Sequence, residues 1–370
     1  MERHFTRRAV IAGAVGFATS AFSTRTKAAP SLKVLAEQRG MFFGAAVAAD
    51  KLRLDSSFKS AIINECSSLT PEVSLKWGEV EPSKGRLEMA AMDEIAELAR
   101  ANGLKTYGHA LLWHGSVPLW AEAMLRDGPD WQPVRNYFAS VMPRYSDIIQ
   151  HWDVVNEPIE TGDRDDGLRD NAFLRAFGRD YIERALDEAR IFAPEGKLMI
   201  NEYGLEYDNP VERDRRYLFL KLLEYLKSKN VPLDGVGLQA HLDLRKGMVS
   251  AKGIRDFLHE IKGLGLAVVI TELDVKEADY SISAERRDVA VADETRRYLE
   301  VALDCPVVKG VTTWGLTDRY SWLQVTEEEL ATYKGMWKDG GGPGLNRGLP
   351  LDAMLTPKRM YAAIASSLAS

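Results

Sequence analysis

The sequence alternates regularly between short apolar runs and amphipathic segments, and this alternation restricts the possible folds more than any other feature. Eight apolar runs follow one another at fairly even spacing. Several are nearly continuous hydrophobic stretches, as expected for strands buried on both faces of a parallel sheet. The runs begin at Met41, Ser67, Leu104, Ile149, Lys197, Leu233, Leu266 and Val308.

The intervening segments carry helix signals. Apolar residues recur at helical spacing within residues 87–103, and Gly103 stands where a C-cap glycine is expected. Similar segments begin at Arg215 and Ile254, and a last helix is expected near Pro357, a favourable first-turn residue. Alternating strands and helices imply parallel strands, and eight such pairs predict an α/β protein with a single (β/α)8 barrel domain. An open, doubly wound sheet is the alternative, weakened by the lack of a GxGxxG pattern after the first strand.

The first 29 residues resemble an export signal. Arg7 and Arg8 precede an apolar stretch that reaches about Phe22, and small residues follow as far as Ala29. This order is similar to a twin-arginine signal, and the stretch is shorter than the roughly 20 residues needed to span a bilayer. We therefore expect a cleaved signal over residues 1–29, a catalytic domain over residues 30–370, and a periplasmic or extracellular location.

Composition restricts the partners that the chain can have. The 48 basic and 54 acidic residues give a net charge of −6, which disfavours binding to nucleic acid. No stretch after the signal is long and apolar enough to span a membrane. Cys66 and Cys305 match no metal-ligand spacing, so we expect no metal and no cofactor, and leave open whether the two cysteines pair. A monomer is the default expectation.

Polar and aromatic residues gather at the carboxyl ends of the predicted strands, which form the active-site face of a parallel barrel. Glu157 follows the fourth strand and Glu272 lies in the seventh. A carboxylate at the end of a buried strand is costly unless it is paired or used. Two glutamates facing each other across the barrel mouth suit hydrolysis of a glycosidic bond with retention, for which the carboxyl groups lie about 5–5.5 Å apart. Nearby tryptophans suit the packing of sugar rings.

Six blocks of sequence carry a resemblance to a known family. WDVVNEP surrounds Glu157 and VITELDV surrounds Glu272. Four further blocks are TPEVSLKW (70–77), GHALLWH (108–114), GVGLQAHL (235–242) and TTWGLTDRYSW (312–322). In this order they resemble motifs of glycoside hydrolase family 10, the retaining endo-1,4-β-xylanases, and the resemblance extends from about residue 40 to residue 365.

The resemblance implies a role for each matching residue. Glu157 would be the general acid and then the general base, and Glu272 would be the nucleophile. Asn156 would bind the 2-hydroxyl of the attacked sugar, while His241 and Asp274 would orient Glu272 and keep it ionised. The implied substrate-binding residues are Glu72, Lys76, His109, Trp113, Gln239, Trp314 and Trp322.

The resemblance also bears on specificity. Trp314 and Trp322 would leave little room for a hydroxymethyl group, which favours xylose over glucose. Val73 stands where the family usually has Asn, and Ser116 stands where it usually has Gln. Both positions normally contact the next sugar on the non-reducing side, so we expect that subsite to be weakened or reshaped.

These inferences predict endo-acting hydrolysis of β-1,4 bonds in xylan or xylo-oligosaccharides through a covalent glycosyl-enzyme. The alternatives are another retaining β-glycanase, acting on β-glucan or mannan, and a non-catalytic barrel that binds polysaccharide. The irregular segment at about 324–347, which contains GGGPG, is expected to be a loop on the rim of the active site.

Overall fold

The computed structural model divides the chain into residues 1–30 and residues 31–370, and only the second unit is described below. The predicted signal and almost all of the predicted rim loop lie outside the residues that the structure describes. The described residues are Met1, 30–277, Asp279, 281–324 and 346–370.

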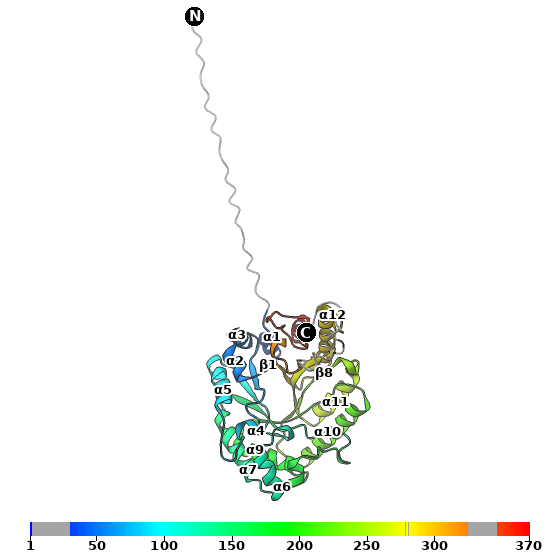
Figure 1. The fold of residues 1–370 in the computed structure, drawn as a ribbon. Helices are drawn as coiled ribbons and strands as arrows, with labels where there is room; N and C mark the ends of the chain where they lie inside the picture. Colours follow the sequence, from blue (N-terminus) through cyan, green and yellow to red (C-terminus); the bar gives the residue numbers. More distant parts are fainter. Residues whose placement is uncertain (2–29, 278, 280, 325–345) are drawn as a thin grey trace. The chain divides into compact units, whose positions relative to one another are not determined.

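Parallel strands close into a barrel, and the helices lie outside it (Figure 1). Along the chain, the eight strands of the barrel alternate with helical segments. The strands are β1 (Phe42–Val47), β2 (Ser68–Pro71), β3 (Lys105–Gly108), β4 (Leu112–Trp113), β5 (Ile149–Asn156), β6 (Lys197–Glu202), β7 (Gly235–Leu238), β8 (His241–Asp243), β9 (Ala267–Lys276) and β10 (Val308–Thr313). The order around the barrel is β1, β2, β3, β5, β6, β7, β9 and β10, and β10 pairs with β1. This closure confirms the predicted barrel and excludes the open sheet.

The helices bury one face against the strands. They are α1 (Leu32–Gln38), α2 (Ala49–Leu54), α3 (Ser56–Glu65), α4 (Trp77–Val80), α5 (Ala90–Asn102), α6 (Leu119–Asp127), α7 (Gln132–Val141), α8 (Ala172–Phe177), α9 (Tyr181–Phe192), α10 (Pro210–Ser228), α11 (Ala251–Gly263), α12 (Ala284–Leu303) and α14 (Arg359–Ala369). Gly103 ends α5 with φ 65°, the left-handed conformation that its C-cap position requires. α14 packs against α1 and α12.

Three helix starts differ from the sequence prediction. α11 begins at Ala251 rather than at Ile254, because the Ser250 side chain accepts a hydrogen bond from the backbone N–H of Gly253 and caps the earlier start. α10 begins at Pro210 rather than at Arg215, because the Asn209 side chain accepts a hydrogen bond from the backbone N–H of Glu212 and caps the earlier start. The last helix begins at Arg359, two residues after Pro357. Side-chain caps thus start α10 and α11 earlier than apolar periodicity alone predicts.

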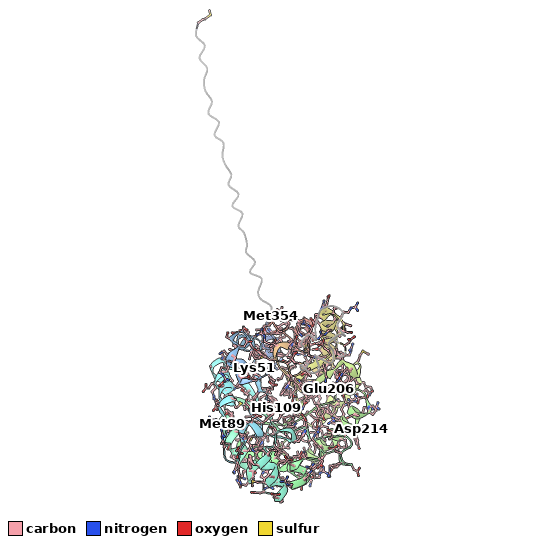
Figure 2. The ribbon with its side chains drawn as sticks, in the orientation of Figure 1. Lys51, Met89, His109, Glu206, Asp214 and Met354 are labelled. Carbon is pink, nitrogen blue, oxygen red and sulfur yellow. The ribbon has the colours of Figure 1, made fainter. Side chains whose placement is uncertain are left out.

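Two predicted strands are interrupted near their carboxyl ends. The third ends as β3 and resumes as β4, and the sixth ends as β7 and resumes as β8. Ala240, between β7 and β8, has φ 57°, in the left-handed region. Each interruption places side chains at the barrel mouth, His109 from the first and Gln239 from the second. Figure 2 draws the side chains on the same ribbon and labels His109.

Within the described residues, no helix combines the length and the apolarity needed to cross a bilayer.

Candidate active site

A cleft of about 940 Å³ is lined by residues from the carboxyl ends of the barrel strands. Every residue that the sequence assigned to catalysis or substrate binding lines this one cleft. These are Glu72, Lys76, His109, Trp113, Asn156, Glu157, Gln239, His241, Glu272, Asp274, Trp314 and Trp322. Their individual roles stay predictions, but their convergence makes the cleft the candidate active site.

Glu272 is the deeper of the two glutamates. Strand β9 carries it, and its side chain is only 6% exposed. Asn201 donates from Nδ2 to its Oε1 at 2.7 Å, and His241 Nε2 lies 3.1 Å from its Oε2. Both carboxylate oxygens are therefore held by neighbouring side chains.

His241 connects Glu272 to a second carboxylate. Its Nδ1 lies 2.8 Å from Oδ1 of Asp274, and Trp322 Nε1 donates to Asp274 Oδ2 at 2.6 Å. Burial alone would lower the pKa of His241, but the charge and hydrogen bond of Asp274, followed by those of Glu272, raise this pKa well above its ordinary value. The two carboxylates that His241 bridges therefore favour its protonated form.

The charge state of Glu272 follows from these neighbours. Burial would raise the pKa of its carboxyl group, but the charge of His109, the hydrogen bond and charge of His241, and the Lys76 ammonium hold the pKa below its ordinary value of 4.5. Glu272 is thus a buried carboxylate kept ionised by its surroundings, which is the state that a nucleophile needs.

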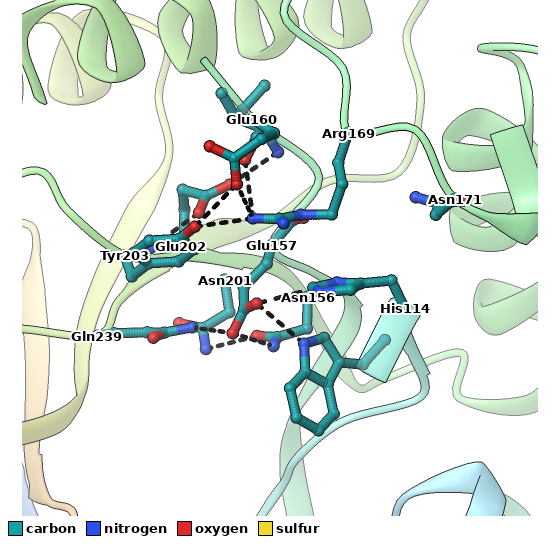
Figure 3. A network of polar contacts seen from close by, with 12 residues as sticks. His114, Asn156, Glu157, Glu160, Arg169, Asn171, Asn201, Glu202, Tyr203 and Gln239 are labelled. Carbon is teal, nitrogen blue, oxygen red and sulfur yellow. Dashed lines mark hydrogen bonds and ion pairs between the residues drawn. The ribbon is translucent and has the colours of Figure 1, made fainter. Parts of the chain in front are cut away.

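Glu157 lies at the end of β5 and is more accessible, with 16% of its side chain exposed. It accepts hydrogen bonds from Trp113 Nε1 at 3.0 Å, Gln239 Nε2 at 3.1 Å and Asn156 Nδ2 at 3.1 Å (Figure 3). Its φ of 55° lies in the left-handed region, and its backbone N–H donates to the carbonyl of Asn201. Indole and amide donors, rather than full charges, therefore hold this carboxyl group.

Asn201 links the two glutamates, and no role was predicted for it. Its Nδ2 lies 2.8 Å from Asn156 Oδ1 as well as 2.7 Å from Glu272 Oε1. Its own Oδ1 accepts a hydrogen bond from Thr271 Oγ1 at 2.8 Å. Gly237, its register partner on β7, must lack a side chain, because a Cβ there would lie 2.1 Å from Asn201 Oδ1. The available signal was its place near the carboxyl end of a buried strand, since Asn201 is followed in β6 only by Glu202.

His109 is held from below by Asp153, which was not among the predicted site residues. Fully buried Asp153 lies 2.9 Å from His109 Nδ1 and accepts a hydrogen bond from Tyr107 Oη at 2.8 Å. His109 Nδ1 lies 3.9 Å from Glu272 Oε1. Asp153 therefore fixes the orientation of an imidazole beside the candidate nucleophile.

Lys76 and two tryptophans form a wall of the cleft. The Lys76 ammonium lies 4.4 Å from the centre of the Trp113 ring and 5.7 Å from that of Trp314. Burial lowers the pKa of Lys76, although the charges of Glu272 and Glu157 oppose this change. An ammonium and indole faces side by side can bind the hydroxyl groups and the C–H face of one sugar.

The two positions that depart from the family pattern lie in different surroundings. Val73 lines the cleft and is 46% exposed. The Ser116 side chain accepts a hydrogen bond from the backbone N–H of Gly78 at 3.3 Å, and Ser116 is not among the lining residues of the cleft. Val73 therefore presents an apolar surface to the cleft next to Glu72. Ser116 instead stabilises the backbone at Gly78.

Metal-ligating and thiol groups outside the cleft complete the chemistry of the described side chains. In that part of the chain, no three His, Cys, Asp or Glu residues are grouped so that they could hold a metal ion. Cys66 is buried and Cys305 is half-buried, and both are free thiols.

Comparison with known proteins places the chain in a family. The model of glycosyl hydrolase family 10 matches residues 31–367. Endo-1,4-beta-xylanase A of Phanerodontia chrysosporium is 33% identical over 304 residues, which are 80% of this chain and 70% of that protein. Endo-1,4-beta-xylanase B of Thermotoga neapolitana is 28% identical over 90% of both chains.

Solved structures agree with this assignment. Native xylanase 10B from Thermotoga maritima is 28% identical, with a TM-score of 0.77 over 91% of this chain and 98% of that one. Xylanase 10B from Thermotoga petrophila, solved in complex with xylobiose, is 27% identical, with a TM-score of 0.76 over 91% of this chain and 97% of that one. The chain belongs to glycosyl hydrolase family 10.

Proposed function

We propose that this protein hydrolyses β-1,4-xylosidic bonds within xylan, with retention of anomeric configuration. One observation carries the proposal: Glu157 and Glu272 line the same cleft and are linked through the amides of Asn156 and Asn201. The family membership and the endo-1,4-beta-xylanases among its relatives support the substrate.

In the first step, a carboxylate oxygen of Glu272 attacks the anomeric carbon. The bond from that carbon to the leaving oxygen breaks, and Glu157 donates its proton to this oxygen. A covalent glycosyl-enzyme forms and the shortened chain leaves. The low pKa of Glu272 supplies the charged nucleophile.

In the second step, Glu157 acts as a base. It accepts a proton from water, whose oxygen attacks the anomeric carbon as the bond to Glu272 breaks. Two displacements restore the β configuration, and Glu272 returns to the carboxylate. Asn156, between Glu157 and Asn201, is placed to bind the 2-hydroxyl of the same sugar.

Selectivity for xylose is assigned to Trp314 and Trp322. The Trp314 ring is buried and lies edge-on to His109, with 5.2 Å between ring centres. The Trp322 ring is 55% exposed, and its hydrogen bond to Asp274 holds it beside His241. Rings fixed in this way would restrict the space available to a hydroxymethyl group.

The proposal is tested by incubating the protein with xylan, cellulose and mannan, and by following the anomer of the product by NMR. We expect hydrolysis of xylan with the β anomer formed first. Preferred cleavage of cellulose or mannan would replace the proposed substrate, and binding without cleavage of any polymer would identify a non-catalytic barrel.

We also propose that the protein is exported as a monomer after cleavage near residue 29. The basic and apolar order of the first residues supports export. N-terminal sequencing of the protein from periplasm and medium tests the cleavage, and replacement of Arg7 and Arg8 by Lys should keep the precursor in the cytoplasm. Light scattering tests the monomer.

A further inference from the structure

We propose that Arg169 is a positioning residue for Glu157, holding the backbone of the acid/base in the conformation that aims its carboxyl group at the leaving oxygen. The inference rests on the proposed function, because it assigns to Glu157 the role of proton donor. Arg169 belongs to the segment between β5 and α8, outside the motifs that identified the site.

Arg169 contacts the backbone of Glu157 directly. Its Nε donates to the carbonyl oxygen of Glu157 at 3.0 Å, and its Nη2 donates to the carbonyl of Ile159 at 3.3 Å (Figure 3). The side chain is 14% exposed, so water competes little for these bonds. The guanidinium thus ties together the turn that follows β5.

This turn requires stabilising hydrogen bonds because Glu157 has a left-handed backbone conformation. Residues with a Cβ seldom adopt φ 55°, and such a conformation persists only where neighbouring groups enforce it. The N–H of Glu157 is held by the carbonyl of Asn201, at 2.8 Å. Arg169 supplies the matching bond to the carbonyl, so both backbone polar groups of Glu157 are fixed.

Arg169 is in turn held by a partly buried ionic network. Glu160 forms an ion pair with Arg169 at 2.8 Å and accepts a hydrogen bond from Arg215 at 3.0 Å. Burial would raise the pKa of Glu160, but the two arginines and the Tyr203 hydroxyl hold it below its ordinary value, so Glu160 stays ionised. The guanidinium is thereby locked by a carboxylate rather than left to rotate.

The same guanidinium contacts a residue of the cleft wall. Arg169 Nη2 donates to Tyr203 Oη at 2.8 Å, and Tyr203 lines the cleft. Arg169 therefore couples the turn carrying Glu157 to a ring of the cleft wall. Loss of the two hydrogen bonds from the Arg169 guanidinium to the backbone would let the Glu157 carboxyl group leave its position. Glu272, on the other side of the cleft, would keep its own contacts.

The effect should depend on how much the leaving group needs a proton. A misplaced proton donor slows departure of an alkoxide but not of a stable phenolate. The test compares kcat/KM of Arg169→Gln on 2,4-dinitrophenyl and methyl β-xylobiosides, since kcat/KM reports the steps through formation of the glycosyl-enzyme. We expect a loss of about tenfold or more on the methyl glycoside and less than about twofold on the dinitrophenyl glycoside.

Arg164→Gln is the matched control, because Arg164 lies in the same segment but pairs with Asp166 at the surface, 46% exposed. It should leave both rates unchanged. Equal losses of Arg169→Gln on both substrates, or no loss on either, would overturn the assignment. Should Arg169→Gln melt below the assay temperature, Arg169→Lys gives the same ratio, since an ammonium keeps the charge but cannot make the forked contacts.

Failure of the inference can be distinguished from failure of the proposed function. Glu157→Ala is measured on the same two substrates, and the proposed role requires it to show the same leaving-group dependence more strongly. If Glu157→Ala lacks this dependence, the acid/base assignment is wrong. If Glu157→Ala shows it and Arg169→Gln does not, only the positioning role of Arg169 is wrong.

Discussion

The two sides of the cleft hold their carboxyl groups by different means. On the β9 side, Glu272 is deeply buried and surrounded by His109, His241 and Lys76, which lower its pKa. On the β5 side, Glu157 is more accessible and accepts hydrogen bonds from indole and amide groups. The same side-chain type is thus surrounded by cations in one place and by neutral hydrogen-bond donors in the other.

The two environments differ in the charge of the neighbours. Cationic neighbours make protonation of Glu272 unfavourable, which suits its proposed role as nucleophile. Neutral donors around Glu157 orient the carboxyl group without a cation in direct hydrogen-bond contact.

Glu272→Ala should have the largest effect. Removal of a nucleophile is expected to lower kcat on xylan by on the order of 10⁵-fold or more. With added azide and an activated aryl xylobioside, the variant should form the α-glycosyl azide, because azide fills the space of the lost carboxylate and attacks from its side. If Glu272→Ala kept activity near the wild-type level, or formed the β-glycosyl azide, Glu272 would not be the nucleophile.

Glu157→Ala should have the next largest effect. Loss of a general acid is expected to lower kcat on xylan by about 10²–10⁴-fold. Azide should restore turnover of an activated aryl xylobioside and give the β-glycosyl azide, because azide then replaces the water on the Glu157 side. Opposite azide anomers from the two variants would establish the difference between the two sides, and identical anomers would contradict it.

Asp274→Asn should make the β9 side of the cleft more like the β5 side, because Glu272 would lose a cationic neighbour. Without this carboxylate the pKa of His241 falls, and the pKa of Glu272 rises because His241 loses its charge. The acidic limb of kcat/KM, which follows ionisation of Glu272, should therefore move to higher pH, with a loss of about 10–100-fold at neutral pH.

Asp304→Asn, at the exposed end of α12, provides the control for Asp274→Asn and should leave the pH profile unchanged. An unmoved acidic limb in Asp274→Asn would show that His241 does not set the charge of Glu272.

Val73→Asn should have the smallest effect, because Val73 contacts neither carboxyl group through a hydrogen bond and is 46% exposed. One new hydrogen bond to the adjacent sugar contributes about 0.5–1.5 kcal/mol, so KM for xylotriose should fall about two- to tenfold. The kcat for an aryl xyloside should not change. A large change in kcat would mean that this wall acts on the reacting sugar.

Much of the fold was predictable because its signals are local. Apolar runs located all eight barrel strands, and Gly103 identified the end of α5. Caps and strand interruptions were less predictable. The start of α10 depends on the Asn209 side chain, and the break before His241 depends on the left-handed turn at Ala240.

The candidate site was predictable where its residues end buried strands or stand in motifs. Asn201, Asp153 and Arg169 were not assigned, because their contacts join positions far apart in the chain. Asn201 and Glu272 are separated by 71 positions, and His109 and Asp153 by 44. Such pairs have no period or spacing that a single sequence could reveal.

The order of residues alone specified which strands the chain forms and which carboxylates stand at their ends, since hydrophobic periodicity is a local property. The ionised state of Glu272, the amide bridge through Asn201 and the tie between Arg169 and the Glu157 backbone required the closed barrel. Each depends on distances of a few ångströms across space, and electrostatic and hydrogen-bond energies decline steeply with that separation.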